Sequence, residues 1–324
     1  MLRVFLSVDD DLTQIEDIQS KGTWISLVNP LDGELEKVHE VTGVDPDFLK
    51  APLDPEERSR IESDEGQVLI IINVPIMQNG GSTVLYDTIP FGIIITNDHF
   101  ITVCHRQNPL LDELAETKLR GLNTKKRTRL LLQLLFKTAT LYLKYLRQID
   151  KQTDEIENQL HRSMKNEELI KLLNLEKSLV YFNTSLRSNE YVMEKLLRSR
   201  LVKVDSEAIK TAQVLQMYPD DEELLEDVII ENKQAMEMCQ IHSDIMSGMM
   251  DAFASVISNN VNIVMKFLTS VTIVLSIPTM VSSFFGMNVP LPFAKTPFAF
   301  AIIMLISFGI SGTVAYLMAR RKMF

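Results

Sequence analysis

The chain has 324 residues, a hydrophobic content of 46% and a formal net charge of −10, which allows two domains and argues against nucleic acid as a partner. The charge is unevenly distributed, because no Asp or Glu follows Asp251. Since the last 64 residues carry +5 and the whole chain carries −10, residues 1–260 carry −15. An acidic part of this size suits divalent cations as partners.

Residues 1–108 alternate short apolar strands with short helices, which predicts a cytoplasmic α/β domain. Pro75 is expected to end a strand, and Gln78 to Gly81 to form a turn. Asn97, Asp98 and His99 separate two apolar runs, which indicates a hairpin. The predicted strands are 1–8, 23–28, 68–74, 91–96 and 100–104, with a helix at 31–42.

The first 14 residues contain no charged leader followed by a long apolar run, so no cleaved signal peptide is expected. The soluble part is therefore predicted to stay in the cytoplasm. Cys104 falls in a predicted strand and Cys239 in a predicted helix. Buried free thiols are the interpretation that we favour over a disulfide or a metal pair.

Residues 109–218 are predicted to form long antiparallel cytoplasmic helices, at 127–164 and 166–198, because apolar residues recur there at helical spacing. Lys125, Lys126 and Arg127 precede the first of these helices. Three basic residues at such a place are typical of a solvated helix start, with a nucleic-acid or lipid-headgroup contact as the alternative.

A stalk helix is predicted at 219–264, because Pro219 and two acidic residues suit a helix N-terminus. The same helix is expected to continue without a break to Met287. Apolar residues along the stalk keep close to a 3.5-residue period. This spacing suits a bundle of several such stalks.

The stretch 265–288 is predicted to be a transmembrane helix, because residues 267–287 carry no charge over a length that spans a bilayer. It contains seven hydroxyl residues. Four of them lie within an arc of about 60° on a helical wheel. These four, the hydroxyl stripe, are Thr272, Ser276, Thr279 and Ser283.

Two interpretations of the hydroxyl stripe stay open from the residues alone. The hydroxyls could bond to their own helix carbonyls or pack on a neighbouring helix, or they could face a water-filled path. Pro278 lies about 120° from the stripe, so its kink would not enter that path. Gly286 is expected to turn left-handed and to release Asn288 across the membrane mouth.

An external loop (289–296), a second transmembrane helix (297–319) and a basic cytoplasmic tail (320–324) are predicted to follow. Arg320, Arg321 and Lys322 hold the C-terminus in the cytoplasm by the positive-inside rule. With two spans, the N-terminus lies on the same side of the cell membrane. Asn288 and the loop are therefore expected to face outward.

The motif Gly286-Met287-Asn288 ends the first of two C-terminal spans and follows Asn262-x-x-Met265-Lys266-x-Leu268-Thr269. This combination resembles the CorA family of magnesium transport proteins. The resemblance implies a funnel-shaped homopentamer with one central pore and an α/β cytoplasmic N-terminal domain, followed by long α-helices and two C-terminal transmembrane helices. It also implies a selectivity filter at Gly286, Met287 and Asn288.

The resemblance further implies a pore lined by one face of the first span. Met265 and Leu268 match the family's hydrophobic constriction, where apolar rings can stop ions by dewetting. The pore-lining residues are expected to be Asn262, Met265, Leu268, Thr272, Ser276, Thr279 and Ser283.

Two spans cannot enclose an aqueous path, so a pore requires several copies of the chain in the bilayer. Mg²⁺ sheds its water reluctantly, whereas carboxamide and hydroxyl oxygens can hydrogen-bond that water shell. A ring of Asn288 fits this task. No nucleotide-binding motif and no catalytic constellation is present in the sequence, so gradient-driven transport is expected, without enzyme activity or an organic cofactor.

Cytoplasmic Mg²⁺ is expected to close the channel, because five acidic domains around one axis repel one another and bound divalent cations relieve the repulsion. Asp227 and Asp251 match the family's Asp-Val and Gly-x-x-Asp positions and are the candidate regulatory metal sites. The sequence departs from the family at Ile230 and Glu231, where an acidic residue and a His often stand. The loop also departs, since its only charged residue is Lys295.

Two alternatives come from other classes of protein. A zinc transporter of the same superfamily would keep the fold and change the ion, although Met287 favours magnesium over zinc. A membrane-anchored coiled-coil scaffold would need neither the hydroxyl stripe nor the Gly-Met-Asn motif. The order of preference among Mg²⁺, Co²⁺, Ni²⁺ and Zn²⁺ stays open.

Overall fold

The structure is a computed structural model, and its contacts divide the chain into two compact units, residues 1–248 and 249–324. The residues that the structure describes are 1–8, 11–80, 83–116, 123–163, 166–201, 215, 217–287 and 298–321.

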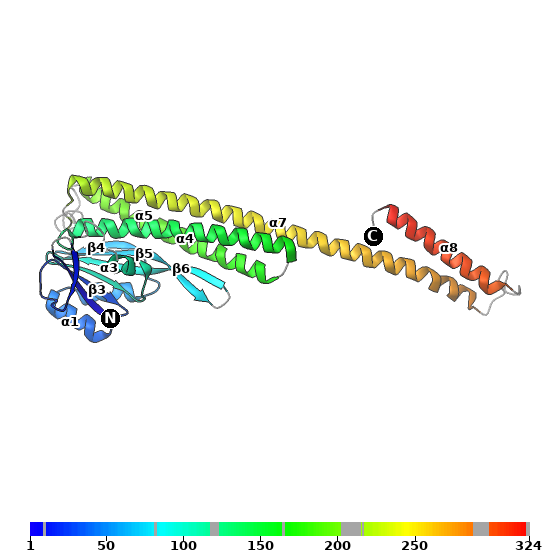
Figure 1. The fold of residues 1–324 in the computed structure, drawn as a ribbon, viewed down its shortest axis with the longest axis horizontal. Coiled ribbons are helices and arrows are strands. Elements are labelled where there is room, and N and C mark those ends of the chain that lie inside the picture. The colour runs from blue at the N-terminus through cyan, green and yellow to red at the C-terminus, as the bar shows by residue number, and fades with distance from the viewer. Residues whose placement is uncertain are drawn as a thin grey trace. The chain divides into compact units, whose positions relative to one another are not determined.

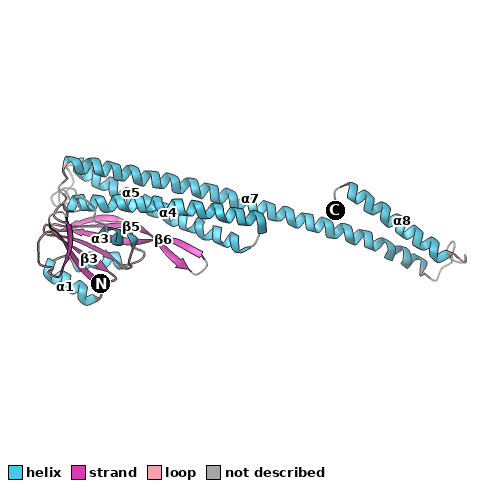
Figure 2. Cartoon of the chain, in the orientation of Figure 1, coloured by secondary structure: helices cyan, strands magenta, loops and turns pink. Residues whose placement is uncertain are grey.

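The first unit is built on one seven-stranded sheet with the strand order β2-β1-β3-β7-β6-β5-β4 (Figures 1 and 2). Strands β3 and β7 run parallel, and all other neighbouring strands run antiparallel. The strands are β1 (Leu2–Val8), β2 (Asp11–Ile15), β3 (Thr23–Val28), β4 (Arg60–Asp64), β5 (Gln67–Gly80), β6 (Thr83–Ile95) and β7 (His99–Cys104).

One face of the sheet packs against the short helices α1 (Asp32–Thr42) and α2 (Pro46–Lys50), which the 3-10 turn η1 (Ala51–Leu53) follows. Successive strand residues point to opposite faces. Leu69 and Ile71 of β5 accordingly join Val38 of α1 in one core, while Ile70 and Ile72 are fully buried without belonging to it. Both faces of the central strands are therefore covered, as the unbroken burial of β3 and β7 requires.

The opposite face is covered by the long helices α4 (Arg127–Ser163) and α5 (Asn166–Leu201), and α3 (Pro109–Glu116) packs beside α4. Aromatic rings and polar bonds tie these helices to β5. The Tyr142 hydroxyl donates to the carbonyl oxygen of Asn73 at 2.9 Å, and its ring meets that of Phe182 edge-on at 5.0 Å. The Asn189 carboxamide accepts from the Asn73 N–H and donates to its carbonyl. The sheet therefore holds α4 and α5 in fixed positions.

The first half of α7 (Pro219–Phe285) lies on the far side of α4 and α5 from the sheet (Figure 1). Tyr218 precedes its first turn, and its N–H donates to the Asp221 carboxylate, which is one half of a capping box. Further along, Asn232 and Cys239 donate to the carbonyl oxygens of Leu186 and Leu179 of α5. Helix α7 is unbroken from Pro219, as predicted, and it ends at Phe285, two residues before the expected end at Met287.

Cys104 and Cys239 are both buried free thiols, as predicted. Burial disfavours the thiolate and raises the pKa of each thiol to about 12. Both side chains therefore behave as small apolar groups with a weak S–H donor.

The predicted end of a strand at Pro75 is wrong. Strand β5 passes through Pro75, which pairs with Thr88 of β6, and continues to Gly80. Gln78 to Gly80 of the predicted turn therefore belong to the strand, and Gly81 lies outside the described residues. The pairing with β4 ends at Ile71. Beyond that point one edge of β5 has no β4 partner, and a proline without an N–H is tolerated there.

Candidate functional site

The second unit contains the C-terminal part of α7 and the helix α8 (Ala299–Arg320), both long and apolar enough to cross a membrane. Only 6% of the apolar window of α7 and 11% of that of α8 are buried. A core helix of a soluble protein would instead be mostly covered by its own chain. The two helices therefore have the exposure that membrane spans have.

The hydroxyl stripe lies on the face of α7 that stays exposed, with all four of its residues in that state. The residues that other parts of the chain cover lie on the opposite face, about 180° around the helix. There Ser270 is fully buried, and the partly covered residues are Val271, Val274, Ile277, Pro278, Val281 and Phe285. Helix α8 lies alongside this part of α7 (Figure 1). The covered residues place the contact on the side of α7 away from the hydroxyl stripe.

Small residues make this helix–helix contact close. Ser307 and Ser311 of α8 are 4% and 7% exposed, four residues apart and hence on one face. Small residues at this spacing let two membrane helices approach closely. This pair was not predicted from the sequence, although the Ser-x-x-x-Ser spacing could have indicated it. Pro278, also on the covered side, leaves α7 continuous.

Three hydroxyls of the stripe donate to carbonyl oxygens of their own helix. The hydroxyl of Thr272 donates to the carbonyl oxygen of Leu268 at 2.8 Å. The hydroxyl of Ser276 donates to that of Ile273 at 2.8 Å, and the hydroxyl of Thr279 donates to that of Leu275 at 3.4 Å. The hydroxyl protons of these three residues are therefore bound by carbonyl oxygens of the same helix, as the first interpretation of the hydroxyl stripe expects. Each oxygen still carries lone pairs that can accept a hydrogen bond from outside the helix.

Helix α7 ends at Phe285, and the expected left-handed turn at Gly286 is wrong. The Gly286 N–H still donates to Ser282 at 3.0 Å, and the Met287 N–H donates to Phe284 at 3.4 Å. The chain therefore leaves the helix through a tightened last turn. Asn288, which completes the predicted filter, lies outside the described residues, as do the loop 289–296 and residues 322–324.

The remaining predicted pore residues lie at the start of the apolar part of α7, and all are exposed. Met265 and Leu268 are 55% and 57% exposed, and Asn262 is exposed one turn earlier. Met265 lies within about 20° of the centre of the hydroxyl stripe and Leu268 within about 50°. The single chain thus places these apolar side chains and the stripe on one uncovered side of the helix.

Asp227 and Asp251 are exposed on α7, and neither forms an ion pair with another residue in the described ranges. Among those residues, no group of three or more His, Cys, Asp or Glu side chains could hold a metal ion. The described residues of one chain therefore bring no such group of metal-binding side chains to Asp227 or Asp251.

An α/β unit on a seven-stranded sheet, joined through one long helix to a pair of apolar helices, defines a membrane protein with two C-terminal spans. The profile of the CorA-like Mg²⁺ transporter proteins matches residues 19–321. The chain belongs to this family.

Two curated relatives are named cobalt/magnesium transport protein CorA. The one from Methanocaldococcus jannaschii is 28% identical over 97% of this chain and 95% of its own length. The one from Thermotoga maritima is 23% identical over 83% of this chain and 74% of its own length. The complete structure of the CorA magnesium transporter from M. jannaschii matches with a TM-score of 0.80, at 25% identity over 99% of this chain and 98% of that chain.

Proposed function

We propose that this protein is a channel that carries Mg²⁺ down its electrochemical gradient through the cell membrane, with Co²⁺ and Ni²⁺ as further candidate ions. The transport unit is a homopentamer in which five copies of α7 surround one pore and α8 lies outside. Both termini face the cytoplasm. Membership of the CorA-like family supports the ion, and the impossibility of enclosing a path with two spans supports an assembly of several chains.

The observation that carries the proposal is the uncovered hydroxyl stripe. Waters bound to Mg²⁺ direct their hydrogens outward, so a pore wall that contacts the hydrated ion must offer hydrogen-bond acceptors. Thr272 and Ser276 give their own protons to backbone carbonyls and so present only lone pairs outward. The stripe is therefore suited to pass an ion that keeps its water shell.

A ring of five Asn288 carboxamides forms the selectivity filter together with Gly286 and Met287. The described parts of both spans contain no carboxylate, so direct coordination by charged ligands is not available along the helices. The filter accordingly selects by hydration shell and ring size. Met265 and Leu268 form the hydrophobic gate below the stripe.

The test is Mg²⁺ flux into liposomes that contain only this protein, compared between wild type and Thr272→Val/Thr279→Val. Valine keeps the shape of threonine and removes the acceptor oxygen. We expect the initial rate to fall about tenfold, because a loss of about 1.4 kcal/mol of stabilisation over ten positions is enough for that change.

The matched control is Thr313→Val. Thr313 is equally exposed and donates to its own helix at 2.8 Å, but it lies on α8. Its flux should equal that of wild type. Equal losses in both variants would show that the hydroxyls serve the helices and not the ion, and faster Zn²⁺ than Mg²⁺ flux would favour the zinc-transporter alternative.

Closure by cytoplasmic Mg²⁺ is a second element of the proposal. Asp227 and Asp251 bind cations between subunits, which relieves the repulsion among five parts that each carry −15. In wild type, millimolar Mg²⁺ should slow both proteolysis and flux. In Asp227→Ala, both effects should weaken, because the cation loses a ligand.

Asp154→Ala is the control for this change, since Asp154 is an exposed aspartate of α4 without an ion pair in the described part of the chain. It should respond to Mg²⁺ as wild type does. A variant Asp227→Ala that still closes normally would remove this residue from the mechanism.

A further inference from the structure

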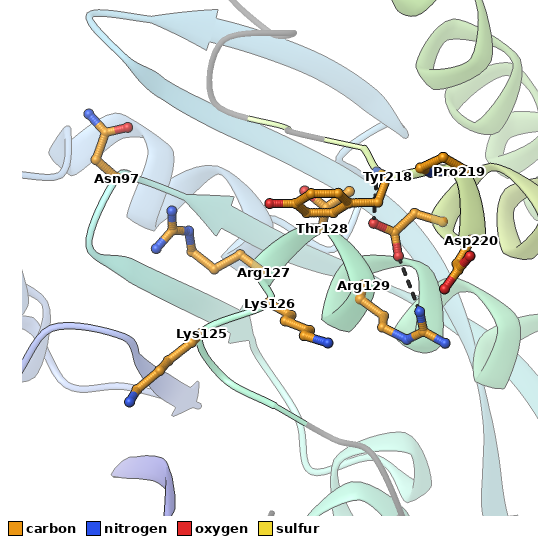
Figure 3. A pocket seen from close by; sticks show the side chains of 10 residues that line it. Asn97, Lys125, Lys126, Arg127, Thr128, Arg129, Tyr218, Pro219 and Asp220 are labelled. Atoms are coloured by element: carbon orange, nitrogen blue, oxygen red, sulfur yellow. Dashed lines mark hydrogen bonds and ion pairs between the residues drawn. The ribbon is translucent and has the colours of Figure 1, made fainter.

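A cavity of about 500 Å³ in the first unit is lined by four basic side chains, in a chain whose net charge is −10. It lies where α4 and α7 begin (Figure 3). Its size is within the range of small-molecule sites. The lining residues are Asn97, Lys125, Lys126, Arg127, Thr128, Arg129, Tyr218, Pro219, Asp220 and Asp221.

The positive charges at this cavity are only partly compensated. Arg129 pairs with Asp221 at 3.6 Å, and the Tyr218 N–H donates to the same carboxylate. Within the described ranges, Lys125, Lys126 and Arg127 form no ion pair. Three cations are thus left to face a ligand, against the exposed carboxylate of Asp220.

The start of α4 contradicts the usual chemistry of a helix N-terminus. The positive end of the helix dipole favours acidic residues and a capping oxygen. Here the capping position is Lys126, whose carbonyl accepts from the Leu130 N–H, and the first turn holds no acidic residue. The N–H groups of residues 127–129 have no partner within the helix. An anion in the cavity would compensate both the cations and these N–H groups.

A second, independent observation is the hydroxyl of Thr128. This side chain is 94% buried, lines the cavity and forms no hydrogen bond with any residue that the structure describes. Within the described residues, the fully buried side-chain atoms without a partner do not include its oxygen, so the hydroxyl is accessible from the cavity. A ligand oxygen in the cavity would satisfy it.

Tyr218 adds an apolar surface to the same cavity. Its ring is 64% exposed, although its backbone is held at the start of α7. Such a ring can stack on a planar base. We infer that this cavity binds a nucleoside di- or triphosphate, with the phosphates at the start of α4 and the base on Tyr218. This site is independent of the proposed ion path.

The test is calorimetric titration of the full chain in detergent with sodium ATP and with sodium pyrophosphate, at matched ionic strength and with a chelator to remove Mg²⁺. Both ligands should bind, and ATP should bind more tightly because it adds the contact with Tyr218. Lys125→Gln/Lys126→Gln should weaken both at least about tenfold, since charge-assisted bonds contribute about 1.5–3 kcal/mol each. Tyr218→Leu should lower the affinity for ATP to the affinity for pyrophosphate.

Lys37→Gln/Lys50→Gln removes two exposed lysines of α1 and α2 and is the control for charge. It should bind as wild type. Thermal unfolding without ligand monitors the fold, and Lys125→Gln/Lys126→Gln should be at least as stable as wild type, because it removes cations from the positive end of a helix.

Absence of ATP binding to wild type, or equal binding by Lys125→Gln/Lys126→Gln, would overturn the inference. ATP binding no tighter than that of pyrophosphate would overturn the nucleotide assignment. Tighter binding of a soluble short-chain phosphatidic acid would assign the cavity to a lipid headgroup instead.

Discussion

Asn288→Ala is expected to abolish selective Mg²⁺ flux while the oligomer stays intact. The change removes five carboxamides from the proposed filter ring. Each carboxamide that bonds the hydrated ion contributes about 1.5–3 kcal/mol as a hydrogen bond to a charged group, so the loss of the ring should cost far more than tenfold in rate or in selectivity. Flux of Mg²⁺ and of a monovalent cation into liposomes measures both outcomes, and the mass of the detergent-solubilised assembly reports the oligomer.

Asn259→Ala is the matched control, because Asn259 is exposed on α7 but lies about 130° from the centre of the hydroxyl stripe. Its flux should equal that of wild type. Normal selective flux in Asn288→Ala would refute the filter, and loss of the oligomer would make Asn288 a packing residue instead.

Long periodic segments of the fold could be predicted from the sequence, because their signals repeat over many turns. Helices α4, α5 and α7 follow from apolar spacing, and the start of α7 follows from Pro219. The short strands β2 and β4 were missed, since five residues carry too little pattern. Pro75 misled the prediction, because whether a strand tolerates proline depends on its neighbours in the sheet, which the sequence does not state.

The proposed ion path likewise has features that the sequence predicts and features that depend on packing. A helical wheel is enough to align Thr272 with Ser276, but it cannot say which face a second helix covers. That answer depends on where α8 packs, and the buried Ser270 and Ser307 supply it. The left-handed turn at Gly286 was expected from a statistical preference of helix ends, whereas the local hydrogen bond to Ser282 keeps Gly286 in the helical pattern.

The basic cavity could not have been predicted from sequence. Lys125 and Arg127 are separated by about 90 residues from Tyr218, and only the packing of α7 along α4 brings them to one place. A run of three basic residues is common at a solvated helix start. What distinguishes this one is a lysine at the capping position, a first turn without an acidic residue, and a Thr128 hydroxyl that lines the cavity and forms no hydrogen bond within the described residues.

Leu268→Ser is expected to make the channel leak when cytoplasmic Mg²⁺ is high. Leu268 lies just below the hydroxyl stripe, and its carbonyl already accepts the Thr272 hydroxyl, so the backbone bond survives the change. In the proposed assembly five leucines form an apolar ring that excludes water, and five serines would hydrate it. Each loss of about 1.4 kcal/mol from the barrier raises the closed-state flux tenfold.

The measurement is Mg²⁺ flux into liposomes with millimolar Mg²⁺ on the side of the soluble domain. Leu305→Ser, an exposed leucine of α8, introduces the same polar group outside the proposed pore and should stay closed. Leakage in both variants would point to general weakening of the spans, and leakage in neither would move the gate away from Leu268.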